Sequence, residues 1–295
     1  MTWAVVARKD FQDAVRSRWL WVLSALFVIV FALPPALVFY LEFGSFGAQQ
    51  AQQQGGSTDV FIFLLKGPTS ILVPLIAIVI SYASVTRERE SGTMKLLLSL
   101  PHSRENVVVG KVLGRSAVVA LPVAVGFLFA LLVLLPTSLT LNLGNFLLFA
   151  ILTVLLGAVF VGLAVGVSAA ADTNRQAVVG SVGLFFLFTF FWNLPVNQIV
   201  DRLGLGNEAA IEMTVLLKLL NPTQAYKTLA DTLLADSAVA ARIQMFGLFR
   251  RSAAAEVLGD SLPFYLSDPL ALVYLLAWLV LPVAAGILVF RDLDL

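Results

Sequence analysis

Long apolar segments separated by short polar ones fill most of the 295-residue chain. A helix needs about 20 apolar residues to cross the roughly 30 Å hydrocarbon core of a bilayer. One charge-free stretch, 116–171, is too long for a single helix and is divided by a polar turn at 136–144. The pattern predicts an all-α, polytopic membrane protein with six transmembrane helices, at 19–41, 67–86, 116–135, 145–171, 177–199 and 269–290.

The composition supports a membrane location and argues against several other functions. Only 13% of the residues are charged, against about 25% in a typical soluble chain. A net charge of +1 offers no basic surface, so no nucleic-acid partner is expected. There is no cysteine, and the single histidine, His102, cannot form a metal cage. The Gly-x-x-x-x-Gly-Lys-Ser/Thr motif is also absent, so we predict no enzyme activity, no metal and no cofactor on this chain.

Basic residues gather on one side of the predicted membrane helices. Twelve lysines and arginines lie in the N-terminal segment, in the 87–115 loop and after spans four and six. The 42–59 loop and the 136–144 turn have none, and Lys66 can extend its amine from the second span to the interface. Because positively charged loops stay in the cytoplasm, we predict a plasma-membrane protein with both termini cytoplasmic.

The N-terminal segment, 1–18, is amphipathic and lacks the cleavage site of a signal peptide. Trp3 and Phe11 fall on its apolar face, which Asp10 interrupts, whereas Arg16 and Arg18 carry charge close to the first span. Aromatic and basic side chains of this kind anchor helices at lipid headgroups. We predict a cytoplasmic interfacial helix; a straight extension of the first span is the alternative.

The fourth predicted span contains small residues at a spacing of four, including Gly162 and Gly166. Small residues at this spacing allow two membrane helices to approach closely. The partner is either another helix of the same chain or a second copy of the protein. Gly166-Val-Ser168 also has the spacing of a serine-nucleophile motif, but no histidine lies in the membrane to act as its base.

Residues 201–268 form the longest segment outside the predicted spans, and their pattern is helical. Asn207 opens one helix, which Asn221-Pro222 ends. A second helix follows to about residue 236, and Ser237 can cap a third. We therefore predict a helical extracytoplasmic segment before the last span.

The 87–115 loop carries the most specific pattern. Gly92 allows the backbone to turn at the end of the second span, Thr93 can cap a short helix, and Pro101 ends that helix. A further helix, capped by Ser103, then leads into the third span. One face of the short helix is apolar and consists of Met94, Leu97 and Leu98. Such a helix either rests on the membrane surface or offers a compact contact to a partner.

The sequence Glu90-Ser-Gly-Thr-Met-Lys-Leu-Leu-Leu-Ser-Leu-Pro101-His-Ser-Arg104, followed by Gly110-Lys111, resembles the loop of ABC-2-type ABC transporter permeases. The six spans, the N-terminal helix and the external segment before the last span are also similar to that family. Within the family, the segments 16–19 and 220–226 are most similar to the permease of the nitrous-oxide-reductase maturation (Nos) transporter.

The resemblance implies that residues 93–100 form a coupling helix that docks into a separate ATP-binding subunit. Glu90 and Gly92 would set its hinge, and Lys111 and Arg115 would anchor the following helix at lipid headgroups. The docked contact would consist of Thr93, Met94, Leu97, Leu98 and Pro101. ATP and Mg²⁺ would bind to the partner subunit, and this permease would pair with a second copy or a similar permease.

These features predict the membrane-spanning permease subunit of an ATP-binding cassette transporter, which couples ATP hydrolysis on another subunit to export or other transmembrane transport. An ATP-independent scaffold or sensor that binds a protein partner through the external segment is the alternative. We divide the chain into an interfacial helix (1–18), two spans (19–86), a coupling loop (87–115), three spans (116–200), an extracytoplasmic segment (201–268) and a last span with a short tail (269–295).

Overall fold

The computed structural model describes residues 3–40, 57–92, 103–136, 140–235, 237–247, 250–259 and 262–292. These residues form helices joined by turns and short irregular segments. Six of the helices are long and apolar enough to cross a membrane. The prediction of an all-α, six-span protein is therefore confirmed for this part of the chain.

The six spans follow the predicted segments with shifted ends, since the helices of the second and third spans begin ahead of residues 67 and 116 and the fifth span ends at Phe191, ahead of residue 199. They are α2 (Arg18–Tyr40), α4 (Ser57–Ser81), α7 (Arg104–Leu134), α8 (Leu143–Ala170), α9 (Asn174–Phe186), which continues as the π-helix η1 (Leu187–Phe191), and α15 (Asp268–Asp292). The second span begins ahead of the predicted residue 67, because Gly67 and Pro68 do not interrupt α4. Proline within a membrane helix is tolerated where neighbouring helices pack around it, and α4 packs against α8 and α7.

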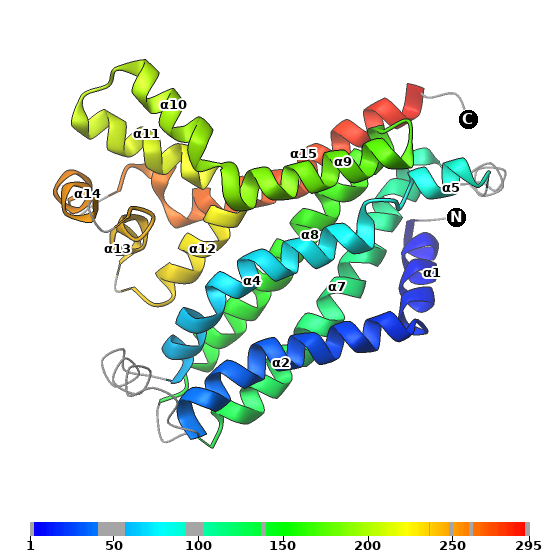
Figure 1. Ribbon diagram of the computed structural model, residues 1–295, viewed down its shortest axis with the longest axis horizontal. Coiled ribbons are helices and arrows are strands. Elements are labelled where there is room, and N and C mark those ends of the chain that lie inside the picture. Colours follow the sequence, from blue (N-terminus) through cyan, green and yellow to red (C-terminus); the bar gives the residue numbers. More distant parts are fainter. Residues whose placement is uncertain are drawn as a thin grey trace.

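Helix α8 lies at the centre of the bundle. It packs against α4, α7, α9 and α15, and its residues are apolar around the whole helix (Figure 1). A helix that is apolar on every side has to be covered by other helices or by lipid. On the far side of α7, α2 completes the bundle, and Phe31 of α2 contacts Phe127 of α7 edge to face.

The two ends of the bundle differ (Figure 1). One end holds both termini, together with α1 (Trp3–Val15) and α5 (Thr86–Glu90). The external segment gathers at the other end and contains α10 (Asn193–Leu203), α11 (Asn207–Leu219), α12 (Pro222–Thr232), α13 (Ala238–Ile243), α14 (Arg251–Leu258) and the short 3₁₀-helix η3 (Phe264–Leu266). An even number of spans places both termini at the same end.

The helices of the external segment begin where the sequence predicts. α11 starts at Asn207, Asn221 caps α12, and Ser237 caps α13 by accepting a backbone N–H at 3.2 Å. The third predicted helix is split, because the chain leaves α13 at Gln244 and starts again as α14.

Helix α12 enters the bundle between α4, α8 and α15. Its Tyr226 is fully buried, and the hydroxyl lies 2.7 Å from Thr69 Oγ1 of α4 and 3.0 Å from Thr153 Oγ1 of α8. Lys66 of α4 forms an ion pair with Asp231 of α12. This contact differs from the predicted extension of the Lys66 amine to the membrane interface. Polar contacts inside the protein therefore fasten the external segment to two spans.

The turn before α12 joins two more spans to the external segment. The Asn221 side chain donates to the Phe188 carbonyl in η1 at 2.8 Å, and the Trp278 indole of α15 donates to the Leu220 carbonyl at 2.6 Å. Segment 220–226, which carries the resemblance to the Nos permease, thus contacts four spans through its polar atoms.

Candidate functional site

Two of the predicted coupling residues, Glu90 and Gly92, are described, and the helix α5 that leads to them lies at the end of the bundle that holds both termini (Figure 1). Glu90 ends α5, and Gly92 follows it. The residues predicted to contact the ATP-binding subunit, Thr93, Met94, Leu97, Leu98 and Pro101, lie outside the described residues. The described part of the candidate site therefore consists of α5, which ends just before Gly92, and the start of α7, which follows Ser103.

Helix α5 is separated from α4 by a turn, and a side chain of another span caps its beginning. The amides of Val85 and Thr86 lie 3.1 and 3.2 Å from Ser168 Oγ of α8. The first amides of a helix have no partner within the helix, so a serine oxygen at this place acts as a cap. Ser168 is fully buried, and the serine that shares the spacing of a nucleophile motif has a structural role.

Lys111 links α7 to α5. Its Nζ lies 2.6 Å from Glu88 Oε1, and the Lys111 side chain is only 1% exposed, against 26% for Glu88. This position corrects the prediction that Lys111 anchors α7 at lipid headgroups. A buried ammonium needs a paired charge, and the turn after α4 brings Glu88 within reach.

Arg115 links α7 to α1 and α4. Its Nε lies 3.2 Å from Asp10 Oδ2, and its guanidinium also donates to the Ile80 carbonyl. The charge of Arg115 is thus paired within the protein, while its side chain is 30% exposed and contact with lipid headgroups stays a prediction. Asp10, which interrupts the apolar face of the N-terminal helix, is only 11% exposed and turned toward this arginine.

Two glycines let α1 cross the beginning of α7. A Cβ added to Gly110 would lie 2.7 Å from the Trp3 carbonyl oxygen, and one added to Gly114 would lie 2.9 Å from the Ala7 carbonyl oxygen. Contacts this close between backbones require glycine. The two glycines are four residues apart in the sequence, a spacing that is typical of a close helix contact.

The remaining predicted interfacial residues lie at the surface of α1 and of the turn after it. Trp3 is 46% exposed, Arg16 and Arg18 are exposed, and Phe11 is half-buried. α1 is a separate helix that lies across the ends of the spans, so the alternative of a straight extension of α2 is wrong (Figure 1). The placement leaves these side chains free to meet lipid headgroups, which stays a prediction.

Helix α5 is also held against the turn between α8 and α9. Glu90 Oε1 accepts the Asn174 N–H at 2.7 Å, and the Arg89 guanidinium donates to the Ala171 carbonyl. Gly92 follows with a φ of 74°, a left-handed conformation that L side chains rarely adopt. The chain thus turns sharply at Gly92, directly after a helix fixed at Glu90, Arg89 and Glu88.

The far end of the coupling segment is fixed as well. Ser103 caps α7 by accepting a backbone N–H at 3.2 Å, as predicted. Arg104 donates to the carbonyls of Phe290 and Arg291 at 2.7 and 2.9 Å, and so bonds the last turn of α15. The described residues on either side of 93–102 are therefore held by contacts with α7, α9 and α15.

Gly162 and Gly166 face α15 of the same chain. A Cβ added to Gly162 would lie 3.0 Å from the Leu279 carbonyl oxygen, and one added to Gly166 would collide with the Pro282 carbonyl. Gly286 of α15 faces the Gly166 backbone in return. The small residues around Gly162 and Gly166 therefore contact another helix of the same chain. This contact leaves no room for a second copy of the protein on that face of α8.

At the end of the bundle that holds both termini, charged side chains connect helices to one another. Three ion pairs join helices here, and within the described ranges no cluster of three or more His, Asp or Glu side chains could hold a metal ion. These contacts connect α5 to α7, α8 and α9, and α7 to α1.

Known proteins share the sequence over most of its length. A family model described as an ABC-2 family transporter protein matches residues 4–295. The probable ABC transporter permease protein NosY of Pseudomonas aeruginosa is 34% identical over 227 residues, which cover 75% of this chain and 78% of that protein. The protein of the same name from Stutzerimonas stutzeri is 32% identical over 228 residues, with equal coverage. The chain therefore belongs to the ABC-2 family of transporters, as a multi-pass permease subunit whose ATPase is a separate protein.

Proposed function

We propose that this permease couples ATP hydrolysis to transport by docking residues 93–100 onto its ATPase subunit, which binds ATP and Mg²⁺. The fixation of α5 is the observation that carries the proposal. Three consecutive side chains, Glu88, Arg89 and Glu90, attach this helix to three other elements immediately before the turn at Gly92.

Closure of two ATPase subunits would move the docked segment as a rigid body. The motion would pass through α5 into α7 by the Glu88–Lys111 pair, and into α8 and α9 by the contacts of Ser168 and Glu90. Switching between two packings of helices is a common way to amplify a small local displacement. Two copies of this permease, or one copy with a similar permease, would form the pathway between them.

The orientation of the chain follows from the same proposal. The end with α1, α5 and both termini faces the cytoplasm, where ATP is available, and the twelve basic residues of the predicted cytoplasmic segments favour that side. The external segment then lies on the extracytoplasmic side of the plasma membrane.

The cargo is an apolar or amphipathic molecule, or the motion is delivered to an external partner. Charged ligands for a bare metal ion are absent from the predicted spans. Delivery of motion is favoured by segment 220–226, whose contacts with four spans would carry a rearrangement of the bundle to α11 and α12.

Two substitutions in the coupling segment test the docking. We expect Gly92→Asp and Leu97→Asp to insert into the membrane normally but to lose at least nine-tenths of the ATPase subunit in a pull-down from mild detergent. Gly92→Asp also strains a left-handed position, and Leu97→Asp places charge on the apolar face. Leu203→Asp, at an exposed position near the other end, is the matched control.

The readouts are retention of the ATPase subunit and the stimulation of its activity in liposomes. Wild-type retention and stimulation in both variants would exclude this segment as the docking contact. If the wild-type permease itself never retained an ATPase, the ATP-independent scaffold would be the better explanation.

A further inference from the structure

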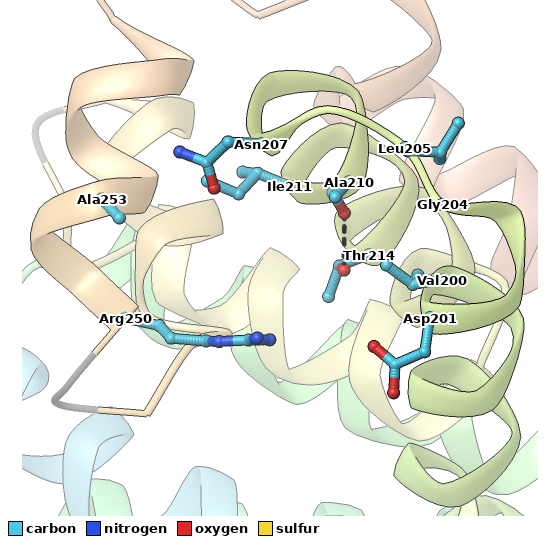
Figure 2. A pocket seen from close by; sticks show the side chains of 10 residues that line it. All are labelled: Val200, Asp201, Gly204, Leu205, Asn207, Ala210, Ile211, Thr214, Arg250 and Ala253. Carbon is cyan, nitrogen blue, oxygen red and sulfur yellow. Dashed lines mark hydrogen bonds between the residues drawn. The ribbon is translucent and has the colours of Figure 1, made fainter.

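A cavity of about 280 Å³ opens in the external segment between α10, α11 and the start of α14 (Figure 2). Asp201 reaches it from the last turn of α10, and Arg250 from the residue before α14. Ala210 and Ile211 of α11 supply apolar lining. The volume suits a small molecule, since ligand pockets for larger compounds begin at about 300 Å³.

The two charged side chains extend into this cavity from opposite sides (Figure 2). Among the described residues, neither the Asp201 carboxylate nor the Arg250 guanidinium makes a hydrogen bond or an ion pair. Thr214, which also lines the cavity, already donates its hydroxyl to the Ala210 carbonyl at 2.7 Å. The cavity therefore offers two unpaired charges of opposite sign and an apolar surface beside them.

A second cation, Lys218, lies close enough to Arg250 to be affected by its charge. The Lys218 ammonium donates to the Met245 carbonyl at 2.7 Å and lies 5.0 Å from the centre of the Phe246 ring. Burial lowers the pKa of Lys218, and the neighbouring Arg250 lowers it further. An anion held by Arg250 would relieve the repulsion between the two cations. The Arg250 side of the cavity is thus the place for a negative group.

An ion with only a negative charge would be attracted by Arg250 but repelled by Asp201. An ion with only a positive charge would be attracted by Asp201 but repelled by Arg250. A molecule that carries both charges satisfies both side chains at once. We propose that the cavity binds a small zwitterion, with its anionic group on Arg250 and its protonated amine on Asp201. The ligand is a free solute or the headgroup of an aminophospholipid, which share this chemistry, and in the orientation proposed above it enters from outside.

Calorimetric titration of the full-length permease in phosphatidylglycerol nanodiscs, without ATP, tests the proposal. Glycerophosphoethanolamine and β-alanine serve as zwitterions, dimethyl phosphate as the anion and ethylamine as the cation. We expect at least one zwitterion to bind tenfold or more tightly than either single ion. Equal binding of dimethyl phosphate, or no binding of any probe, would overturn the proposal.

Variants separate the two charges. Asp201→Asn and Arg250→Gln should each weaken zwitterion binding at least tenfold, because each removes one of the two charged contacts. Arg202→Gln, an exposed neighbour outside the lining, should bind like the wild type. Unchanged binding in both cavity variants would place the zwitterion elsewhere and overturn the assignment.

A change of lipid identifies the source of the ligand. In phosphatidylethanolamine nanodiscs, competition that weakens the soluble zwitterion tenfold supports a lipid headgroup, and unchanged binding supports a free solute. Both results agree with the zwitterion chemistry. Because these titrations need no ATPase subunit, a permease that fails to assemble with an ATPase would contradict the proposed function and leave this site intact.

Discussion

Lys111 and Arg242 are cations that the fold buries almost completely. Arg242 is 0% exposed and donates to the Leu266 carbonyl, to Thr228 Oγ1 and to Asp268 Oδ1 at 2.6–3.0 Å. Lys111 is 1% exposed and pairs with Glu88. A buried charge is stable only when its hydrogen-bonding capacity is satisfied. Each of these cations therefore fixes the relative position of the helices that supply its partners.

The pair of Lys111 and Glu88 is unequally buried, and this predicts unequal mutational effects. Glu88→Gln leaves a buried ammonium without its counter-charge and should lower the free energy of unfolding by about 3 kcal/mol. Lys111→Met leaves a carboxylate that is 26% exposed to solvent, so we expect a loss of only about 1 kcal/mol. Unfolding in an SDS titration measures both, with Lys9→Met on the exposed side of α1 as the control. Equal losses in the two variants would contradict this account.

At the scale of elements, the break between α4 and α5 depends on a contact from α8. Ser168 Oγ accepts the amides of Val85 and Thr86 and also lies 3.3 Å from Thr86 Oγ1. Without this acceptor, two amides at the start of α5 would have no partner.

Removal of the Ser168 hydroxyl should loosen α5 while the spans stay folded. We expect Ser168→Ala to cost about 1–2 kcal/mol locally, which corresponds to roughly tenfold faster hydrogen exchange of the Val85 and Thr86 amides. Mass spectrometry of a peptide covering 82–90 measures the exchange. Ser181→Ala is the matched control, because the buried Ser181 hydroxyl has no hydrogen-bond partner. Unchanged exchange at α5 would mean that the turn holds without its cap.

The contact between α8 and α15 depends on glycine. Gly166→Val would force the Pro282 carbonyl away and should lower the free energy of unfolding by about 3 kcal/mol. Gly183→Val in α9 should cost less than about 1 kcal/mol, because no heavy atom lies within 4 Å of its added Cβ. An SDS titration of the two variants compares them directly, and a tolerated valine at Gly166 would show that the two helices can separate freely.

At the scale of the whole molecule, the two ends of the bundle are joined by continuous helices. α4 and α8 carry the contacts of α5 at one end and those of Tyr226 at the other. In the proposed mechanism, a displacement at the end with α5 would be passed along these continuous helices to the external segment.

The orientation of the bundle can be tested with introduced cysteines, since the chain has none. We expect a membrane-impermeant maleimide to label Leu205→Cys in right-side-out vesicles and Lys9→Cys only after permeabilisation, because the two exposed positions lie at opposite ends of the bundle. Labelling of Lys9→Cys first would reverse the proposed orientation and with it the cytoplasmic site for the ATPase.

The number and order of the spans could be predicted from the sequence because the burial of apolar residues in lipid adds up along a continuous segment. Helix starts at Ser103, Asn221 and Ser237 were also predictable, since a cap bonds amides two or three residues away. The spacing of small residues also predicted the close helix contact around Gly166, whereas the coupling segment at 93–100 stays a prediction.

The sequence by itself therefore determined the spans, the local caps and the family resemblance of the coupling loop. Only the tertiary structure decided which polar groups meet. Lys111 pairs with Glu88 across 23 residues, Ser168 caps Val85 across 83, and Arg115 meets Asp10 across 105. From the sequence alone, Lys111 and Arg115 were interpreted as headgroup contacts, Ser168 as part of a motif with the spacing of a serine nucleophile, and Asp10 as an interruption of an amphipathic face. A buried charge is stable only when the fold places an opposite charge or a hydrogen-bonding group beside it. No local sequence pattern specifies which residue supplies that group.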